Sequence, residues 1–134
     1  MKRLPDCYER LAAYIQSVQD KPFAWGTHDC AHFARGAVHA MTGLVPDAPV
    51  FGAYSSAAAA SRLLKGTSMS EQVSALLGEP MNPLFASRGD VVLYVHEQYG
   101  DALGICAGAT FCAPGDERLE HRPMFEAVRA WAVR

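Results

Sequence analysis

The sequence predicts a single α+β domain over residues 1–134, with N-terminal helices packed on a small antiparallel β-sheet. Three observations support this prediction. Apolar residues recur at helical spacing in the first half, short apolar runs separated by turns occupy the second half, and no linker or repeat divides the chain. A chain of 134 residues is also long enough to bury one hydrophobic core.

The expected helices cover about residues 6–19, 30–41, 56–64 and 69–77. The first begins with a capping-box pattern of Asp6 and Glu9, and Ser68 with Glu71 marks the start of the last in the same way. Gly43 is a stop signal for the second helix. Each of these segments places its apolar residues on one stripe, so each is expected to bury one face.

The expected strands cover residues 91–95, 102–107, 109–113 and 129–133. The segments 44–54 and 80–88 contain prolines and are predicted as loops. Pro114-Gly115-Asp116 is a strong turn signal, and the charged segment that contains His121 is predicted to be irregular.

Residues 25–30, Trp-Gly-Thr-His-Asp-Cys, place one cysteine at the start of the second predicted helix. The positive end of a helix dipole and its free N–H groups favour a thiolate. Thiolate is the nucleophilic form, so Cys30 is the candidate nucleophile of a cysteine hydrolase. Asp29 is expected to cap this helix, because an aspartate there accepts the free N–H groups.

The charge and hydropathy of the chain argue against two classes of partner. The formal net charge is -2 and the isoelectric point is about 6.2, whereas a nucleic-acid partner usually demands a basic face. No apolar stretch reaches the length of a membrane span. The first residues lack the apolar segment of a signal peptide, so we expect a cytoplasmic protein.

The four cysteines have no metal-ligand spacing, so neither a metal site nor a cofactor is expected. Cys7, Cys106 and Cys112 are predicted to be small buried apolar residues.

The order of these motifs resembles the NlpC-type papain-like cysteine peptidases. The matching residues are Trp25, Gly26, Asp29, Cys30, Gly89, Asp90, Val91, Gly104, Ile105 and Gly108. The fuller pattern is more similar to a family without assigned function from phage tail and gene-transfer-agent gene clusters. Its features are Pro22-Phe23-x-Trp25-Gly26, Met41-Thr42-Gly43, Phe51-Gly52-x-Tyr54, Gly89 to Leu93, Leu103-Gly104-Ile105 and Ala130-Trp131-x-Val133. This resemblance implies a papain-like fold over nearly the whole chain.

In those peptidases a histidine before the second strand's Val-Gly-Ile motif is the general base, and a further polar residue orients it. The matching positions here are Ala102 and Cys112. Alanine cannot accept the proton of a thiol. His96 is the weak candidate replacement: with a hairpin loop over 97–101 it lies across from Ala102, and with a loop one residue shorter it faces the other way.

The other histidines are expected to have no catalytic role. His28 and His32 are interpreted as surface residues or local turn partners, His39 as part of the outer helix face, and His121 as part of the charged tail.

The sequence leaves three functions open. The first is a phage or prophage tail-associated assembly component that has lost the catalytic histidine and contacts other particle proteins. The second is a cysteine hydrolase of peptidoglycan peptides that uses Cys30 with His96. In the third, Cys30 takes part in thioester chemistry or in disulfide exchange with Cys112.

Overall fold

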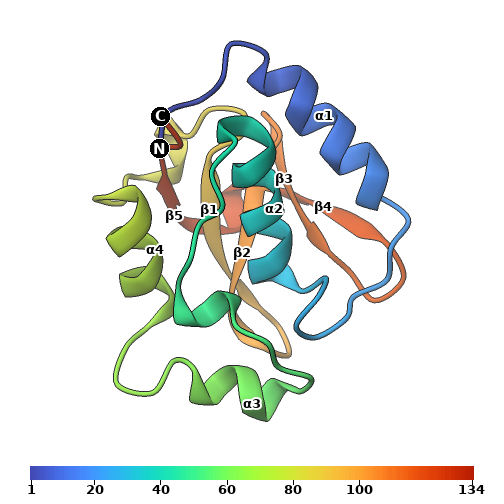
Figure 1. Ribbon diagram of the computed structural model, residues 1–134, viewed down its shortest axis with the longest axis vertical. Coiled ribbons are helices and arrows are strands. Elements are labelled where there is room, and N and C mark those ends of the chain that lie inside the picture. The colour runs from blue at the N-terminus through green and yellow to red at the C-terminus, as the bar shows by residue number, and fades with distance from the viewer.

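A five-stranded antiparallel sheet, in the order β4-β3-β2-β1-β5, forms the centre of the molecule, and the long helices lie against one of its faces (Figure 1). The computed structural model describes all of residues 1–134. The strands are β1 (Val91–His96), β2 (Gly100–Cys106), β3 (Thr110–Pro114), β4 (Leu119–Pro123) and β5 (Ala127–Trp131). The predicted α+β class is therefore confirmed.

Four α-helices and three short 3₁₀ helices complete the fold. They are α1 (Cys7–Val18), α2 (Cys30–Thr42), α3 (Ala57–Arg62), α4 (Met69–Leu77), η1 (Pro49–Phe51), η2 (Pro83–Phe85) and η3 (Met124–Glu126). None of the helices combines the length and apolar character needed to cross a membrane.

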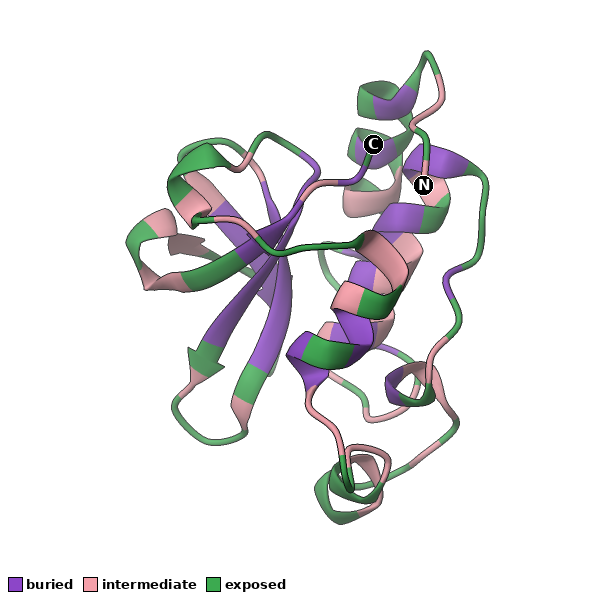
Figure 2. Cartoon of the chain, turned by 90° about the vertical axis from the view of Figure 1, so that its left-hand side faces the viewer, coloured by how far each residue is buried: buried purple, intermediate pink, exposed green.

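Helix α2 is central because it packs on both the sheet and α1. Its apolar stripe is buried against the strands, as the colouring of Figure 2 shows. The helix ends where Gly43 takes a left-handed conformation at φ 75° and donates its N–H to the His39 carbonyl. Gly36 lets α1 approach closely, since a Cβ there would overlap the Tyr14 side chain. The Tyr14 hydroxyl donates to the Phe33 carbonyl at 3.0 Å.

The chain termini are held together on Asp90, which is fully buried at the start of β1. Its Oδ1 accepts from Arg3 Nη2 at 2.9 Å and from the Val133 N–H at 3.1 Å, and its Oδ2 accepts from the Ser87 N–H at 2.8 Å. Arg3 Nε also donates to the Val133 carbonyl at 2.6 Å. Asp90 therefore links the first residues, the β1 entry and the last residues of the chain.

Most predicted elements are observed within two residues of their expected bounds, and the exceptions involve polar residues. Asp6 does not cap α1, because its carboxylate instead accepts from Arg10 Nε at 2.8 Å. Ser68 does cap α4 through the Glu71 N–H. The segment around His121 is not irregular: it forms strand β4, in which His121 pairs with Cys112.

Candidate functional site

The turn before α2 is built to present Cys30. Gly26 adopts φ 79°, and a Cβ at this position would overlap the Tyr54 carbonyl oxygen, so only glycine fits. Asp29 is buried and caps the helix, with Oδ1 accepting from the His32 N–H at 2.9 Å and Oδ2 from the Gly26 N–H at 2.8 Å. The predicted role of Asp29 as N-cap is thus observed.

The two histidines near Cys30 differ in role: His32 is hydrogen-bonded within the turn, and His28 is packed in the interior. His32 Nδ1 lies 2.8 Å from Asp29 Oδ1, and His32 Nε2 lies 3.1 Å from the Phe51 carbonyl oxygen. His32 is therefore a local turn partner, as expected. His28 is not a surface residue: it is buried against the Phe33 ring, and its Nε2 has no hydrogen-bond partner. Burial lowers the pKa of His28, so its neutral form is favoured.

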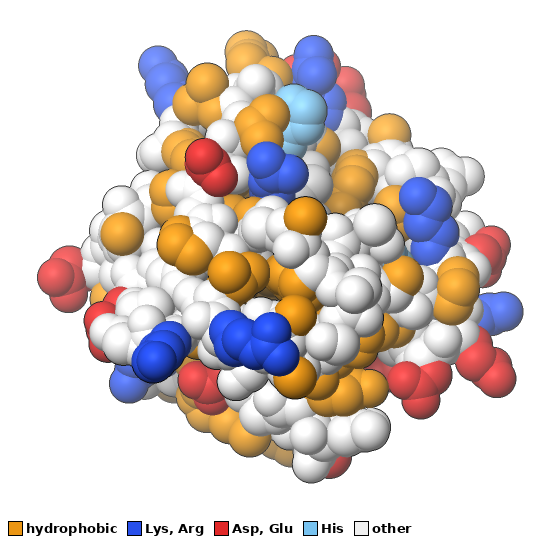
Figure 3. All heavy atoms as spheres, turned by 60° about the horizontal axis from the view of Figure 1, so that its bottom comes forward, with side chains coloured by type: hydrophobic (Ala, Val, Ile, Leu, Met, Phe, Trp, Pro, Cys, Tyr) orange, Lys and Arg blue, Asp and Glu red, His pale blue; other side chains and the backbone are white.

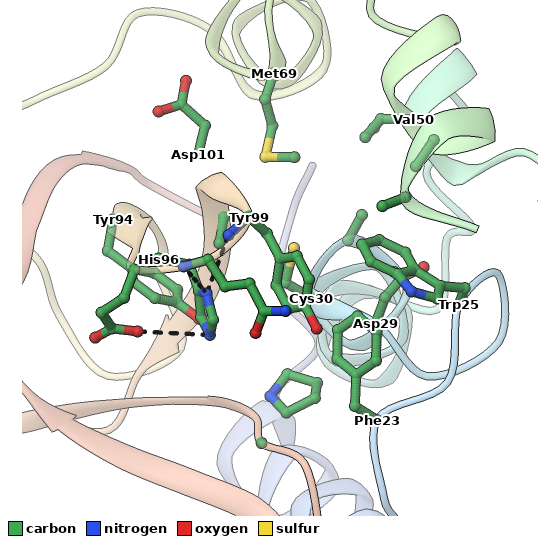
Figure 4. A pocket seen from close by; sticks show the side chains of 18 of the residues that line it. Phe23, Trp25, Asp29, Cys30, Val50, Met69, Tyr94, His96, Tyr99 and Asp101 are labelled. Carbon is green, nitrogen blue, oxygen red and sulfur yellow. Dashed lines mark hydrogen bonds and ion pairs between the residues drawn. The ribbon is translucent and has the colours of Figure 1, made fainter. Parts of the chain in front are cut away.

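Cys30 lies at the floor of a pocket of about 560 Å³. Figure 4 shows its sulfur between the Tyr99 and His96 side chains of the β1–β2 turn and the aromatic residues of the Phe23–Trp25 segment. Burial raises the pKa of the Cys30 thiol to about 12, and the Asp29 carboxylate acts in the same direction. Backbone N–H groups of Leu103 and of the helix start lower it, but not enough to compensate.

The raised pKa opposes the expectation that the helix N-terminus favours a Cys30 thiolate, and the nucleophile role of Cys30 stays a prediction. Loss of hydration and the neighbouring carboxylate both oppose the charge, and together they outweigh the dipole. A raised pKa favours the protonated form of the Cys30 thiol at neutral pH. No hydrogen bond joins it to any histidine ring.

Strand register decides which side chain lies across from Ala102. Tyr94 pairs with Ala102 and His96 with Gly100, so the hairpin turn has only three residues, Glu97 to Tyr99. Neither expected register is correct. The three-residue turn is possible because Gly100 adopts φ 77°, which glycine tolerates. His96 keeps the same face as Tyr94 and Ala102, since side chains alternate along a strand.

His96 lines the pocket, but its ring nitrogens are engaged within its own turn. Nδ1 accepts from the Gln98 N–H at 3.0 Å and the Tyr99 N–H at 3.3 Å, so the ring proton lies on Nε2. Nε2 faces the Glu97 carboxylate at 3.6 Å, and the ring stacks on Tyr99 with centroids 4.7 Å apart. In this arrangement His96 offers no free lone pair to the Cys30 thiol.

Cys112 lies away from the site. It pairs with Ile105, donates its S–H to the Ile105 carbonyl at 3.6 Å and belongs to the core between helices and sheet. Ala102 is three residues from Ile105 and therefore faces the opposite side of β2. All four cysteines are free thiols, and Cys112 does not line the pocket.

Several pocket residues could be found only in the structure. Tyr94 is 2% exposed, and its hydroxyl makes no hydrogen bond. The Arg122 guanidinium lies 4.9 Å from the centre of the Tyr94 ring and pairs with Glu97 through Nη1 at 2.8 Å. Burial raises the pKa of Tyr94, so the phenol is neutral. In the sequence Tyr94 is one aromatic residue of a predicted strand. That it lies across from Ala102 depends on the pairing register of β1 and β2.

No three side chains of the His, Cys, Asp and Glu types are grouped so that they could hold a metal ion.

Comparison with known proteins gives a family and a fold. Residues 2–133 match the model of a family described as "Domain of unknown function (DUF6950)". The structure is similar to the crystal structure of the NlpC/p60 domain of peptidoglycan hydrolase SagA, with a TM-score of 0.60 and 18% sequence identity. The match covers 92% of this chain and 97% of that chain. At this identity the likeness establishes an NlpC/p60-like fold. No curated protein sequence matches the chain.

Proposed function

The chain belongs to the DUF6950 family, and from this premise we propose that it is a non-hydrolytic NlpC-like domain that acts as an assembly component of a phage or prophage tail. One observation carries the proposal: no histidine ring hydrogen-bonds to the Cys30 thiol, because the His96 lone pair is used within its own turn, and the raised pKa of the thiol agrees with this. A cysteine nucleophile needs a proton acceptor or an ion-pair partner.

The residues around Cys30 support the loss of hydrolysis. Ala102 occupies the position at which the NlpC-type peptidases carry their general base. Its side chain is buried, and it lies across from Tyr94 in the same apolar cluster. Asp29, the nearest carboxylate, is engaged by the helix N–H groups and His32. The turn, the helix cap and the glycine positions of the fold are nevertheless intact. A structural role requires the turn, the helix cap and the glycine positions, because they maintain the fold. It does not require a general-base histidine.

The tail assignment rests on the fuller motif pattern, which resembles proteins of phage tail and gene-transfer-agent gene clusters. Its test is whether the protein travels with particles. In particles purified from cells that express a tagged chain, we expect the protein to sediment with the tail fraction. Cys30→Ala should be incorporated equally, because the proposed role does not use the thiol. A chain found only as free monomer beside intact particles would contradict the tail role.

A second candidate, a cysteine hydrolase, is favoured by one observation: Cys30 and His96 line the same pocket. It requires His96 to leave its turn and accept the thiol proton. Under this alternative His96→Ala lowers the rate of Cys30 alkylation at pH 7 by about 100-fold, the range of general-base effects. Under our proposal His96→Ala leaves the rate unchanged. His39→Ala, which changes an exposed histidine on α2, is the matched control.

A further inference from the structure

The His32 ring differs from the other four histidine rings of the chain, because both of its nitrogens face hydrogen-bond acceptors. Nδ1 lies 2.8 Å from Asp29 Oδ1, and Nε2 lies 3.1 Å from the Phe51 carbonyl oxygen. A carboxylate and a carbonyl oxygen accept hydrogen bonds and cannot donate them. A neutral imidazole has one N–H group, so it satisfies only one of these acceptors. The imidazolium has two N–H groups and satisfies both.

The surroundings of the ring leave no other donor for these acceptors. Asp29 already accepts the N–H groups of Gly26 at 2.8 Å and of His32 at 2.9 Å, so it acts as an acceptor throughout. The His32 side chain is 11% exposed and that of Asp29 is 1% exposed, so water has little access between them. His96 shows the opposite arrangement, since its Nδ1 accepts two backbone N–H groups.

Asp29 is the only carboxylate that pairs with the His32 ring. Burial and the Asp29 carboxylate raise the pKa of Tyr54, whose hydroxyl lies 3.5 Å from Nδ1, so this phenol stays neutral. The raised pKa of the Cys30 thiol favours a neutral group there as well. Arg35, one turn further along α2, hydrogen-bonds to the chain that follows the helix. The charge balance at the ring is therefore set by the pair of His32 and Asp29.

The Phe51 carbonyl belongs to segment 44–54, which connects α2 to α3 and runs from the top of Figure 1 to its bottom. The backbone hydrogen bonds within η1 are local and do not tie the segment to the sheet. Side chains of the neighbouring helices hold it: Arg35 Nε donates to the Pro46 carbonyl at 2.9 Å, Gln72 Oε1 accepts from the Val50 N–H at 2.8 Å, and His32 Nε2 meets the Phe51 carbonyl at 3.1 Å. Of these ties, only the last contains an imidazole, the side chain that titrates near neutral pH.

We propose that the His32 imidazolium is a pH-sensitive latch that holds segment 44–54 against α2 and releases it at Phe51 when the ring loses a proton. A carboxylate is a stronger acceptor than a carbonyl, so Nδ1 keeps its proton for Asp29 and Nε2 loses its own. The Nε2 lone pair then faces the Phe51 carbonyl oxygen, and the hydrogen bond between them is lost. The latch is therefore complete at low pH and weakens as pH rises.

Segment 44–54 forms one wall of the Cys30 pocket through Val50 and Tyr54. The fit is close at Gly26, where a Cβ would overlap the Tyr54 carbonyl oxygen. Helix α3 and the tip of the β1–β2 hairpin also line the pocket and lie at the bottom of Figure 1. Figure 3 brings this end forward and shows apolar side chains across its middle with charged ones beside them. Release of the segment is expected to loosen this wall, whatever the pocket binds, so the latch is independent of the proposed assembly function.

NMR of the full chain labelled with ¹⁵N-histidine tests the ring directly, over pH 5 to 8.5, a range that spans histidine titration. At pH 5 we expect both nitrogens of His32 to carry protons. As pH rises, Nε2 should lose its proton while Nδ1 keeps its own, which is the opposite tautomer from that of His96. A His32 ring with one proton at pH 5, with two at pH 8.5, or with its last proton on Nε2 would overturn the proposal.

Hydrogen exchange at the Val50 N–H, which is bonded to Gln72, measures release of the segment. After correction for the intrinsic pH dependence of exchange, we expect wild-type protection at this amide to fall at least about tenfold between pH 5 and 8.5, the effect of losing a charge-assisted hydrogen bond. Burial lowers the pKa of His28, so its titration weakens the turn as pH falls, which is the opposite direction.

Two variants assign the pH dependence to one ring. His32→Gln has no titrating group and should show the same Val50 protection at both pH values. His39→Gln changes an exposed histidine of the same helix and should behave as wild type. Wild-type protection that does not change with pH, or an equal fall in His32→Gln, would overturn the proposal. The two wild-type measurements decide the matter even where a variant does not fold.

Discussion

Replacing Asp90 with alanine is expected to lower the free energy of unfolding by about 3–5 kcal/mol, the usual effect of removing one partner of a buried ion pair. The change leaves the mostly buried Arg3 guanidinium without its carboxylate. It also leaves the N–H groups of Val133 and Ser87 without an acceptor. Urea unfolding followed by circular dichroism measures the difference.

The matched control is Asp6→Ala, which removes an aspartate paired with arginine on the surface of α1. Exposed pairs of this kind contribute little, so its transition should stay close to that of wild type. Asp90→Ala protein that unfolds at the wild-type urea concentration would show that the termini are not held by this residue.

Cys30 is expected to react with iodoacetamide at pH 7 about 100-fold more slowly than a free cysteine. A thiol with a pKa of about 12 has roughly one group in 10⁵ ionised at pH 7, against about 3% for a thiol of pKa about 8.5. The ionised fractions therefore differ by about 3 × 10³. The more basic thiolate is intrinsically more nucleophilic by about 30-fold, which offsets part of it.

Site-resolved mass spectrometry after short alkylation pulses measures this rate without removing the other three cysteines. The rate should rise about tenfold per pH unit up to at least pH 10, because ionisation remains far from complete there. The same protein unfolded in urea is the control, in which all four thiols should react alike. A plateau near neutral pH would instead reveal a thiolate–imidazolium pair.

The order of helices and strands could be predicted because the apolar patterns that mark them are the same ones that bury them. Helix α2 illustrates this: Asp29 caps it, Gly43 ends it, and both signals lie in the sequence beside the helix. Strand β4 was missed because its five residues include only one that is buried, and its pattern is polar. An edge strand of this type is formed by backbone pairing to β3 rather than by its own side chains.

The site could be predicted only in part, because its chemistry depends on burial and register. The position of Cys30 at a helix start was visible, but the loss of hydration that raises its thiol pKa comes from packing against β2 and the neighbouring walls. A one-residue change in the β1–β2 turn determines what lies across from Ala102, and sequence did not specify it. Phe23, Cys30 and Tyr94 come from different segments, so only the fold brings them to one pocket.

The central claim is that this chain keeps an NlpC/p60-like fold without hydrolysing peptide bonds, and the release of peptides from purified peptidoglycan tests it most directly. Wild-type protein and Cys30→Ala are incubated with the same peptidoglycan at pH 7, and soluble peptides are quantified by mass spectrometry. We expect the same background release from both proteins. Release by wild type that Cys30→Ala abolishes would contradict this claim.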